Sequence, residues 1–68
     1  MSAPARALSE PLMTVEDLAA FLRLRRSTLY ELVRAGRVPH VRLGRHIRFE
    51  RSEIARWLTE QHKKERRL

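Results

Sequence analysis

Two short helical patterns joined by a three-residue connection constrain the fold of this 68-residue chain more than any other feature. The first pattern covers residues 15–22, and the second lies within residues 25–36. Their apolar residues recur at the spacing of one helical face, namely Val15, Leu18, Ala19 and Leu22 in the first and Leu29, Leu32 and Val33 in the second. Because the connection over Arg23–Arg25 is so short, the two helices must turn tightly against each other. The sequence therefore predicts two packed helices joined by a tight turn.

Capping residues mark the ends of these helices. Thr14 suits the N-cap of the first helix, with Asp17 three residues later in a weaker relative of the capping box. Gly36 stands where a left-handed residue would close the second helix, and Pro39 prevents its continuation. The second helix is thus predicted to stop firmly at Gly36.

A β-hairpin is predicted over residues 38–49, because apolar and charged residues alternate there. Gly44 and Arg45 resemble a two-residue type II′ turn, but that register would split the apolar side chains between the two faces. We therefore expect an odd loop, with residues 44–46 as loop or bulge. It would pair Leu43 with Ile47, Val41 with Phe49, and Arg42 with Arg48. The facing arginines would repel each other unless an anion lay between them, which favours a phosphate partner.

A third helix is predicted from Arg51 or Ser52 onwards. Its apolar residues Ile54, Trp57 and Leu58 share one face, and we expect Trp57 to be the main side chain of the core. The apolar pattern ends at Gln61, so the basic end of the chain is expected to fray. These elements divide the chain into a disordered leader over residues 1–11, a folded domain over residues 12–62 and a basic tail over residues 63–68.

This order of elements is mainly α with a small β-hairpin, which is the winged helix-turn-helix arrangement. The segments LMTVEDLAAFL, STLYELVRAGRVP, VRLGRHIRF and IARWL resemble the excisionase and MerR-like family of winged helix-turn-helix domains, over Leu12 to about Leu58. Two positions depart from that family. Arg23 stands where the family often has glycine, and an arginine in a left-handed conformation costs about 1 kcal/mol. Arg25 stands where the family often has serine and cannot cap the second helix in the same way, which leaves the exact start of that helix open.

Positive charge is concentrated in one part of the chain. The net charge is +7, and the segment from Arg23 to Arg48 carries all of it, with eight arginines and the single acid Glu31. The remaining bases and acids balance. A local basic field of this kind attracts polyanions, of which nucleic acid is the commonest inside a cell.

Several classes of protein fit the composition poorly. The chain has no cysteine, which excludes disulfides and zinc ribbons. Its three histidines lack metal-ligand spacing, and no nucleophile has a plausible base, so we expect neither an enzyme nor a cofactor. Leu18–Leu22, the longest apolar run, is far shorter than the roughly 20 residues that span a bilayer. We expect a soluble cytoplasmic protein of a bacterial or phage-infected cell that does not bind membranes.

The candidate DNA-binding residues follow from the second helix and the hairpin. They are the groove-side residues Arg26, Ser27, Thr28, Tyr30 and Arg34, the hairpin residues Arg42, Arg45 and Arg48, and two further phosphate-binding candidates, Arg23 and Arg37. The resemblance implies an excisionase, also called a recombination directionality factor. Such a protein binds and bends attachment-site DNA and recruits a phage or mobile-element integrase, so that excision replaces integration.

Two alternatives remain open at the level of sequence. A transcription regulator of the same fold would use the same DNA face, and an antitoxin or adaptor would dock an acidic protein there instead. MerR-type regulators dimerise through a long additional helix, and no heptad pattern continues after Leu58. We therefore expect a monomer that associates cooperatively on directly repeated double-stranded DNA sites.

Overall fold

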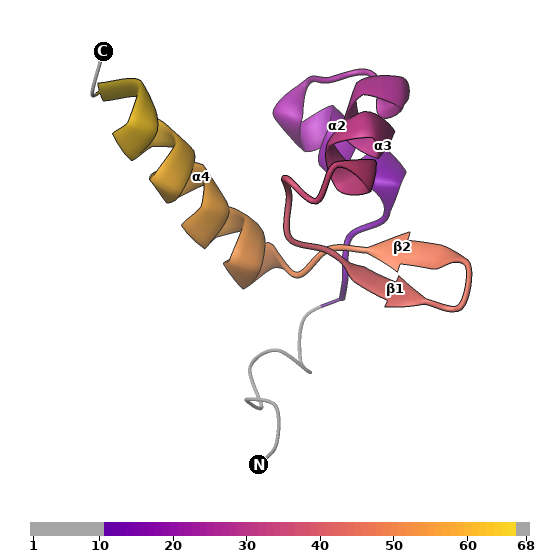
Figure 1. The fold of residues 1–68 in the computed structure, drawn as a ribbon. Coiled ribbons are helices and arrows are strands. Elements are labelled where there is room, and N and C mark those ends of the chain that lie inside the picture. The colour runs from indigo at the N-terminus through magenta and orange to yellow at the C-terminus, as the bar shows by residue number, and fades with distance from the viewer. Residues whose placement is uncertain (1–10, 67–68) are drawn as a thin grey trace.

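The computed structural model describes residues 11–66, and Figure 1 shows their arrangement. In chain order the elements are α2 (Val15–Leu22), α3 (Arg26–Arg34), β1 (Val41–Leu43), β2 (His46–Arg48) and α4 (Arg51–Arg66). Helices α2 and α3 pack together, the antiparallel β1–β2 hairpin follows them, and α4 leads away from the other elements. This confirms the predicted winged helix-turn-helix arrangement. Apart from Pro11, the predicted leader lies outside the described residues.

A small apolar core holds these elements together. Each main part of the fold contributes one of its most deeply buried side chains, namely Leu18 from α2, Leu29 from α3, Phe49 after β2 and Ile54 from α4. Trp57 and Leu58 pack against this core only partly buried. Trp57 is therefore not the main side chain of the core, contrary to the expectation from its spacing. Its indole Nε1–H instead donates to the carbonyl oxygen of Arg37 at 2.9 Å, which ties α4 to the segment after α3.

A backbone bridge joins the start of the domain to the end of the hairpin. Met13 and Phe49 each donate a backbone N–H to the other's carbonyl oxygen, both at 2.9 Å. Both side chains are buried. The bridge therefore places the hairpin and the beginning of α4 directly beside the N-terminus of α2.

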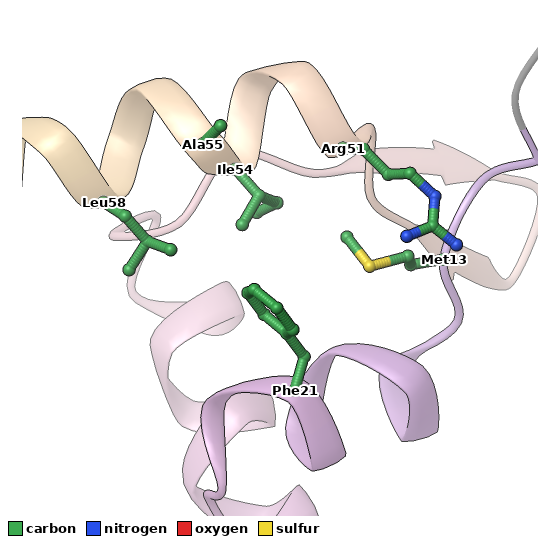
Figure 2. Close-up of a pocket in the computed structure, with 6 residues that line it drawn as sticks. All are labelled: Met13, Phe21, Arg51, Ile54, Ala55 and Leu58. Carbon is green, nitrogen blue, oxygen red and sulfur yellow. The ribbon is translucent and has the colours of Figure 1, made fainter.

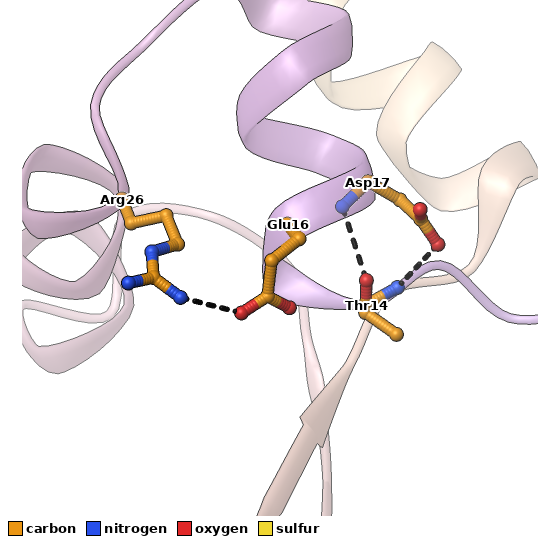
Figure 3. Close-up of polar contacts among 4 residues, drawn as sticks. All are labelled: Thr14, Glu16, Asp17 and Arg26. Carbon is orange, nitrogen blue, oxygen red and sulfur yellow. Dashed lines mark hydrogen bonds and ion pairs between the residues drawn. The ribbon is translucent and has the colours of Figure 1, made fainter.

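The predicted cap of α2 is present as a complete capping box (Figure 3). Asp17 donates its backbone N–H to Thr14 Oγ1, and Thr14 donates its own to Asp17 Oδ2, both at 3.0 Å. The hydrogen bond from the Thr14 backbone, followed by that with the Thr14 side chain, lowers the pKa of the Asp17 carboxyl. The carboxylate is therefore ionised near neutral pH, as an acceptor at a helix N-terminus should be.

The turn between α2 and α3 contains the strain expected from the sequence. Arg23 adopts a left-handed conformation with φ of 59°. The backbone N–H groups of Arg23 and Leu24 donate to the carbonyl oxygens of Ala20 and Ala19, which closes α2 with the bonds of a Schellman motif. Arg25 is the N-cap of α3 and makes no side-chain capping bond, so α3 begins at Arg26.

Helix α3 ends at Arg34, and Gly36 closes it as predicted in a left-handed conformation with φ of 70°. The backbone N–H of Gly36 donates to the carbonyl oxygen of Val33, and that of Arg37 donates to the carbonyl oxygen of Leu32, both at 2.9 Å. These are again the two bonds of a Schellman motif. Glycine adopts this conformation without the steric cost that Arg23 bears.

The predicted register of the hairpin is wrong. The strands pair Val41 with Arg48, Arg42 with Ile47, and Leu43 with His46, so the loop contains only Gly44 and Arg45. Gly44 has φ of 64°, which suits the first central position of a two-residue type II′ turn. The apolar residues are split between the two faces as this register requires, and Leu43 is 51% exposed.

The split is tolerated because Phe49 does not depend on the hairpin for its burial. It pairs with Met13 rather than with Val41, so the core keeps its aromatic side chain in either register. The correction also places Arg42 and Arg48 on opposite faces, because Arg48 is paired with Val41, and Val41 and Arg42 are adjacent residues whose side chains point to opposite faces. Repulsion between these two arginines is therefore no evidence for an anion.

Helix α4 continues beyond the end of its apolar pattern. It extends to Arg66, so residues 63–66 are helical, contrary to the expectation that they fray. Residues 67 and 68 lie outside the described part of the chain. Among the described helices, none combines the length and the apolar composition that crossing a bilayer requires.

We predict that Thr14→Ala lowers the free energy of unfolding by about 1 kcal/mol, because it removes the side-chain acceptor at the N-cap of α2. In a domain of this size that corresponds to a fall in Tm of about 4–8 °C, measurable by circular dichroism. Thr59→Ala is the matched control. The Thr59 hydroxyl bonds the Ala55 carbonyl oxygen within α4, and its loss should change Tm by much less. Equal effects of the two substitutions would contradict a capping role for Thr14.

Candidate nucleic-acid interface

The surface of α3 separates cleanly into a buried and an exposed face. Leu29 and Val33 are buried and Leu32 is half-buried. The candidate residues of the opposite face are all exposed, namely Arg26, Ser27, Thr28, Tyr30 and Arg34. Packing of α3 on the core thus leaves every predicted groove-side residue available to a ligand.

A first basic hollow lies between α3 and the hairpin. Its charged and polar lining consists of Tyr30, Arg34 and Arg42, with Val33 and Ile47 beside them. Arg42 is opposite Ile47 in the strand ladder, so both side chains are on the face of the hairpin that meets α3. The two-residue loop therefore brings a hairpin arginine to the exposed face of α3.

A second basic hollow lies between the hairpin and the N-terminus of α2. It is lined by Thr14, Val15, Glu16, Tyr30, Arg45, His46, Ile47 and Arg48. Arg48 is half-buried, and its Nη1 donates to the carbonyl oxygen of Ile47 at 2.8 Å. Tyr30 is 40% exposed and lines both hollows, so they adjoin. We refer to the two hollows together as the basic surface.

The N-terminus of α3 offers backbone donors in addition to side chains. Arg25 provides no side-chain cap, and no acidic residue occupies the first turn of α3. Ser27 and Thr28 in this turn are exposed. Uncapped N–H groups at a helix N-terminus, together with the helix dipole, attract phosphate oxygens.

Five of the predicted residues line neither hollow of the basic surface, namely Arg26, Ser27 and Thr28 in the first turn of α3, and Arg23 and Arg37 outside that helix. Arg23 lies in the turn between α2 and α3, and Arg37 follows the C-terminal end of α3. Both are exposed. Contacts of all the predicted site residues with DNA stay a prediction.

An ion pair links Arg26 to Glu16 across the two helices (Figure 3). Arg26 Nη1 lies 2.8 Å from Glu16 Oε2, and the two side chains are 63% and 60% exposed. The pKa of the Glu16 carboxyl is lowered first by its own backbone N–H at the start of α2 and then by the Arg26 guanidinium. Glu16 is therefore ionised at neutral pH beside a residue predicted to bind DNA.

The sequence pattern assigns Glu16 no role in DNA binding. Ten residues separate Glu16 from Arg26, so their contact depends on how α2 and α3 cross. Local spacing rules apply to residues three or four apart and cannot detect such a pair.

A separate apolar cleft lies between α2 and α4 (Figure 2). Phe21 points from α2 towards Ile54 and Leu58 of α4, and Met13 and Arg51 lie at the other end of the cleft. Phe21 is 65% exposed. The cleft shares no lining residue with the basic surface, and its lining is apolar apart from Arg51.

A family model described as a helix-turn-helix domain matches residues 12–62, and the chain belongs to that family. Two curated relatives, from two strains of Mycobacterium tuberculosis, each carry the name "Putative DNA-binding protein". Each is 46% identical to this chain over 37 residues, which cover 54% of this chain and 47% of the relative. The chain thus spans about half the length of these relatives. No solved structure matches the chain.

Proposed function

We propose that this protein binds double-stranded DNA, with the exposed face of α3 in the major groove and the β1–β2 hairpin along the neighbouring backbone or minor groove. The observation that carries the proposal is the basic surface, in which α3 and the hairpin present arginines on both sides of Tyr30. Membership of the helix-turn-helix family and the names of the two mycobacterial relatives support it. The charge of +7 supplies the long-range attraction to a polyanion.

Within this proposal some residues contact base edges, and we call them readers. Others bind phosphates, and we call them clamps. Arg34 on α3 reads a base edge, because a guanidinium can donate two hydrogen bonds to a guanine. Arg45 and Arg48 of the hairpin bind phosphates, and Arg42 beside Arg34 fixes the position of α3 on the backbone. Ser27 and Thr28 meet a phosphate or a base at the N-terminus of α3.

We extend the proposal to a role in site-specific recombination. The support is the resemblance of residues 12 to about 58 to excisionases, together with the concentrated positive charge between Arg23 and Arg48. In that role several copies bind cooperatively to direct repeats about one helical turn apart, bend the DNA and recruit an integrase. A transcription regulator would use the same surface without an integrase.

We predict that DNA binding weakens steeply with salt. If five to seven arginines of each copy neutralise phosphates, a plot of log K against log salt concentration should have a slope of about −4 to −6. The measurement is fluorescence anisotropy of a labelled duplex at several salt concentrations. Arg48→Gln should make the slope shallower by about 0.9, whereas Arg56→Gln, an equal change of charge on α4, should not. A slope of the unaltered protein shallower than about −2 would refute the proposed use of the basic surface.

We predict different consequences for a reader and a clamp. Arg34→Ala should cost about 1–3 kcal/mol on a preferred duplex and relax the preference at one base pair, because a base contact is lost. Arg45→Ala should weaken binding to all duplexes by the same factor. Binding of both variants to a library of single-base substitutions provides the comparison. Equal losses on preferred and random DNA for both variants would show that Arg34 does not read a base.

We predict that this protein raises the yield of excision when it is expressed with an integrase encoded beside it. The readout is recombination between two attachment sites that flank a reporter, measured with and without the protein. The variant Arg34→Ala should lose the stimulation because it no longer recognises the attachment site. Repression of a neighbouring promoter without any change in excision would instead assign the protein to transcription regulation.

A further inference from the structure

Glu16 is the only acidic side chain among the described residues that lines either hollow of the basic surface. A carboxylate at this place repels the phosphates that the surrounding arginines attract. The presence of Glu16 in the proposed DNA-binding surface is explained by its ion pair with Arg26.

Stability of the fold does not explain the pair between Glu16 and Arg26. Both side chains are more than half exposed, and exposed ion pairs contribute little to the free energy of unfolding. Glu16 occupies the second position of α2 and Arg26 the first position of α3. The pair thus joins the two helices at the end of α3 that would enter a major groove, where base edges are contacted.

The pair changes what Arg26 can bind. Glu16 Oε2 lies only 2.8 Å from Arg26 Nη1, so the negative charge of the carboxylate largely offsets the positive charge of the guanidinium. A phosphate carries a full negative charge and gains little from approaching this neutral pair. A guanine edge is uncharged and can still accept from the guanidinium, which has five N–H donors and commits only one to Glu16.

Glu16 also restricts the rotamers of the Arg26 side chain. A free arginine loses much rotamer freedom when it binds, and a side chain already held by a hydrogen bond loses less. An oriented planar group with four remaining N–H donors favours directional contacts over a general attraction to the backbone.

We propose that Glu16 is a positioning residue that makes Arg26 a reader of base edges rather than a phosphate clamp, so that Glu16 determines sequence specificity. This inference rests on the proposed DNA-binding function and deepens it. It removes Arg26 from the residues that contribute to the salt dependence of binding, and it assigns a DNA-facing role to an acid that the sequence did not single out.

The test compares Glu16→Gln with the unaltered protein on two probes, a duplex selected by this protein from a random pool and a random duplex of the same length. The substitution keeps the size of the side chain and frees the charge of Arg26. We expect stronger binding to the random duplex, a salt slope steeper by about one unit, and a fall of about tenfold in the ratio of selected to random affinity. The Tm should fall by no more than a few degrees, because the pair is exposed and the substitution otherwise removes only the interaction of the carboxylate with the N-terminus of α2.

Two matched variants separate this mechanism from a general effect of charge. Glu60→Gln makes the same change of charge at an exposed position of α4 and should leave the affinity ratio unchanged. In an Arg26→Gln background, Glu16→Gln should no longer lower the ratio, because the residue through which it acts is gone.

The outcomes distinguish this inference from the function on which it rests. Two outcomes would overturn the inference and leave DNA binding intact. In the first, Glu16→Gln raises the affinities for the selected and the random duplex by the same factor. In the second, Glu16→Gln lowers the affinity ratio equally in the Arg26→Gln background. The same holds if Glu60→Gln lowers the ratio as much as Glu16→Gln does. Failure of the unaltered protein to bind any duplex would overturn the proposed function and the inference with it.

Discussion

The fold depends on burial of a few apolar side chains that come from distant parts of the chain. Leu18, Leu29, Phe49 and Ile54 meet in one core, and the Met13–Phe49 backbone bridge fixes the hairpin beside α2 at that point. A domain of this size can bury only one thin core, so every element depends on that core for its position. The orientation of α3, and therefore of every side chain on its exposed face, follows from the burial of Leu29 and Val33.

Because the core is held together by other contacts, the apolar residues of the hairpin need not all lie on one face. Phe49 in particular is buried through its pairing with Met13. The turn can then use the left-handed conformation of Gly44, which matches the twist of a two-residue hairpin. Arg42 turns towards α3 as a result and lines the first basic hollow together with Arg34 and Tyr30.

The acid that offsets the positive charge at the start of α3 comes from α2 and not from α3 itself. A positive side chain at the first position of a helix is disfavoured by the helix dipole, and α3 has no acid in its first turn to offset Arg26. Glu16 supplies that acid from α2, where the same dipole argument favours it. The geometry that packs the two helices thus also sets the charge of the surface that would face DNA.

The sequence by itself determined the local features. Helical spacing, the Thr14 cap and the Gly36 stop placed α2 and α3 correctly, because these signals act within one turn of helix. The clustering of arginines between Arg23 and Arg48 likewise needed no structure. Only the tertiary structure decided the strand register, the partial burial of Trp57 and the pairing of Glu16 with Arg26. Each of these depends on contacts between elements, where the competition for one small core outweighs the preference of any single segment.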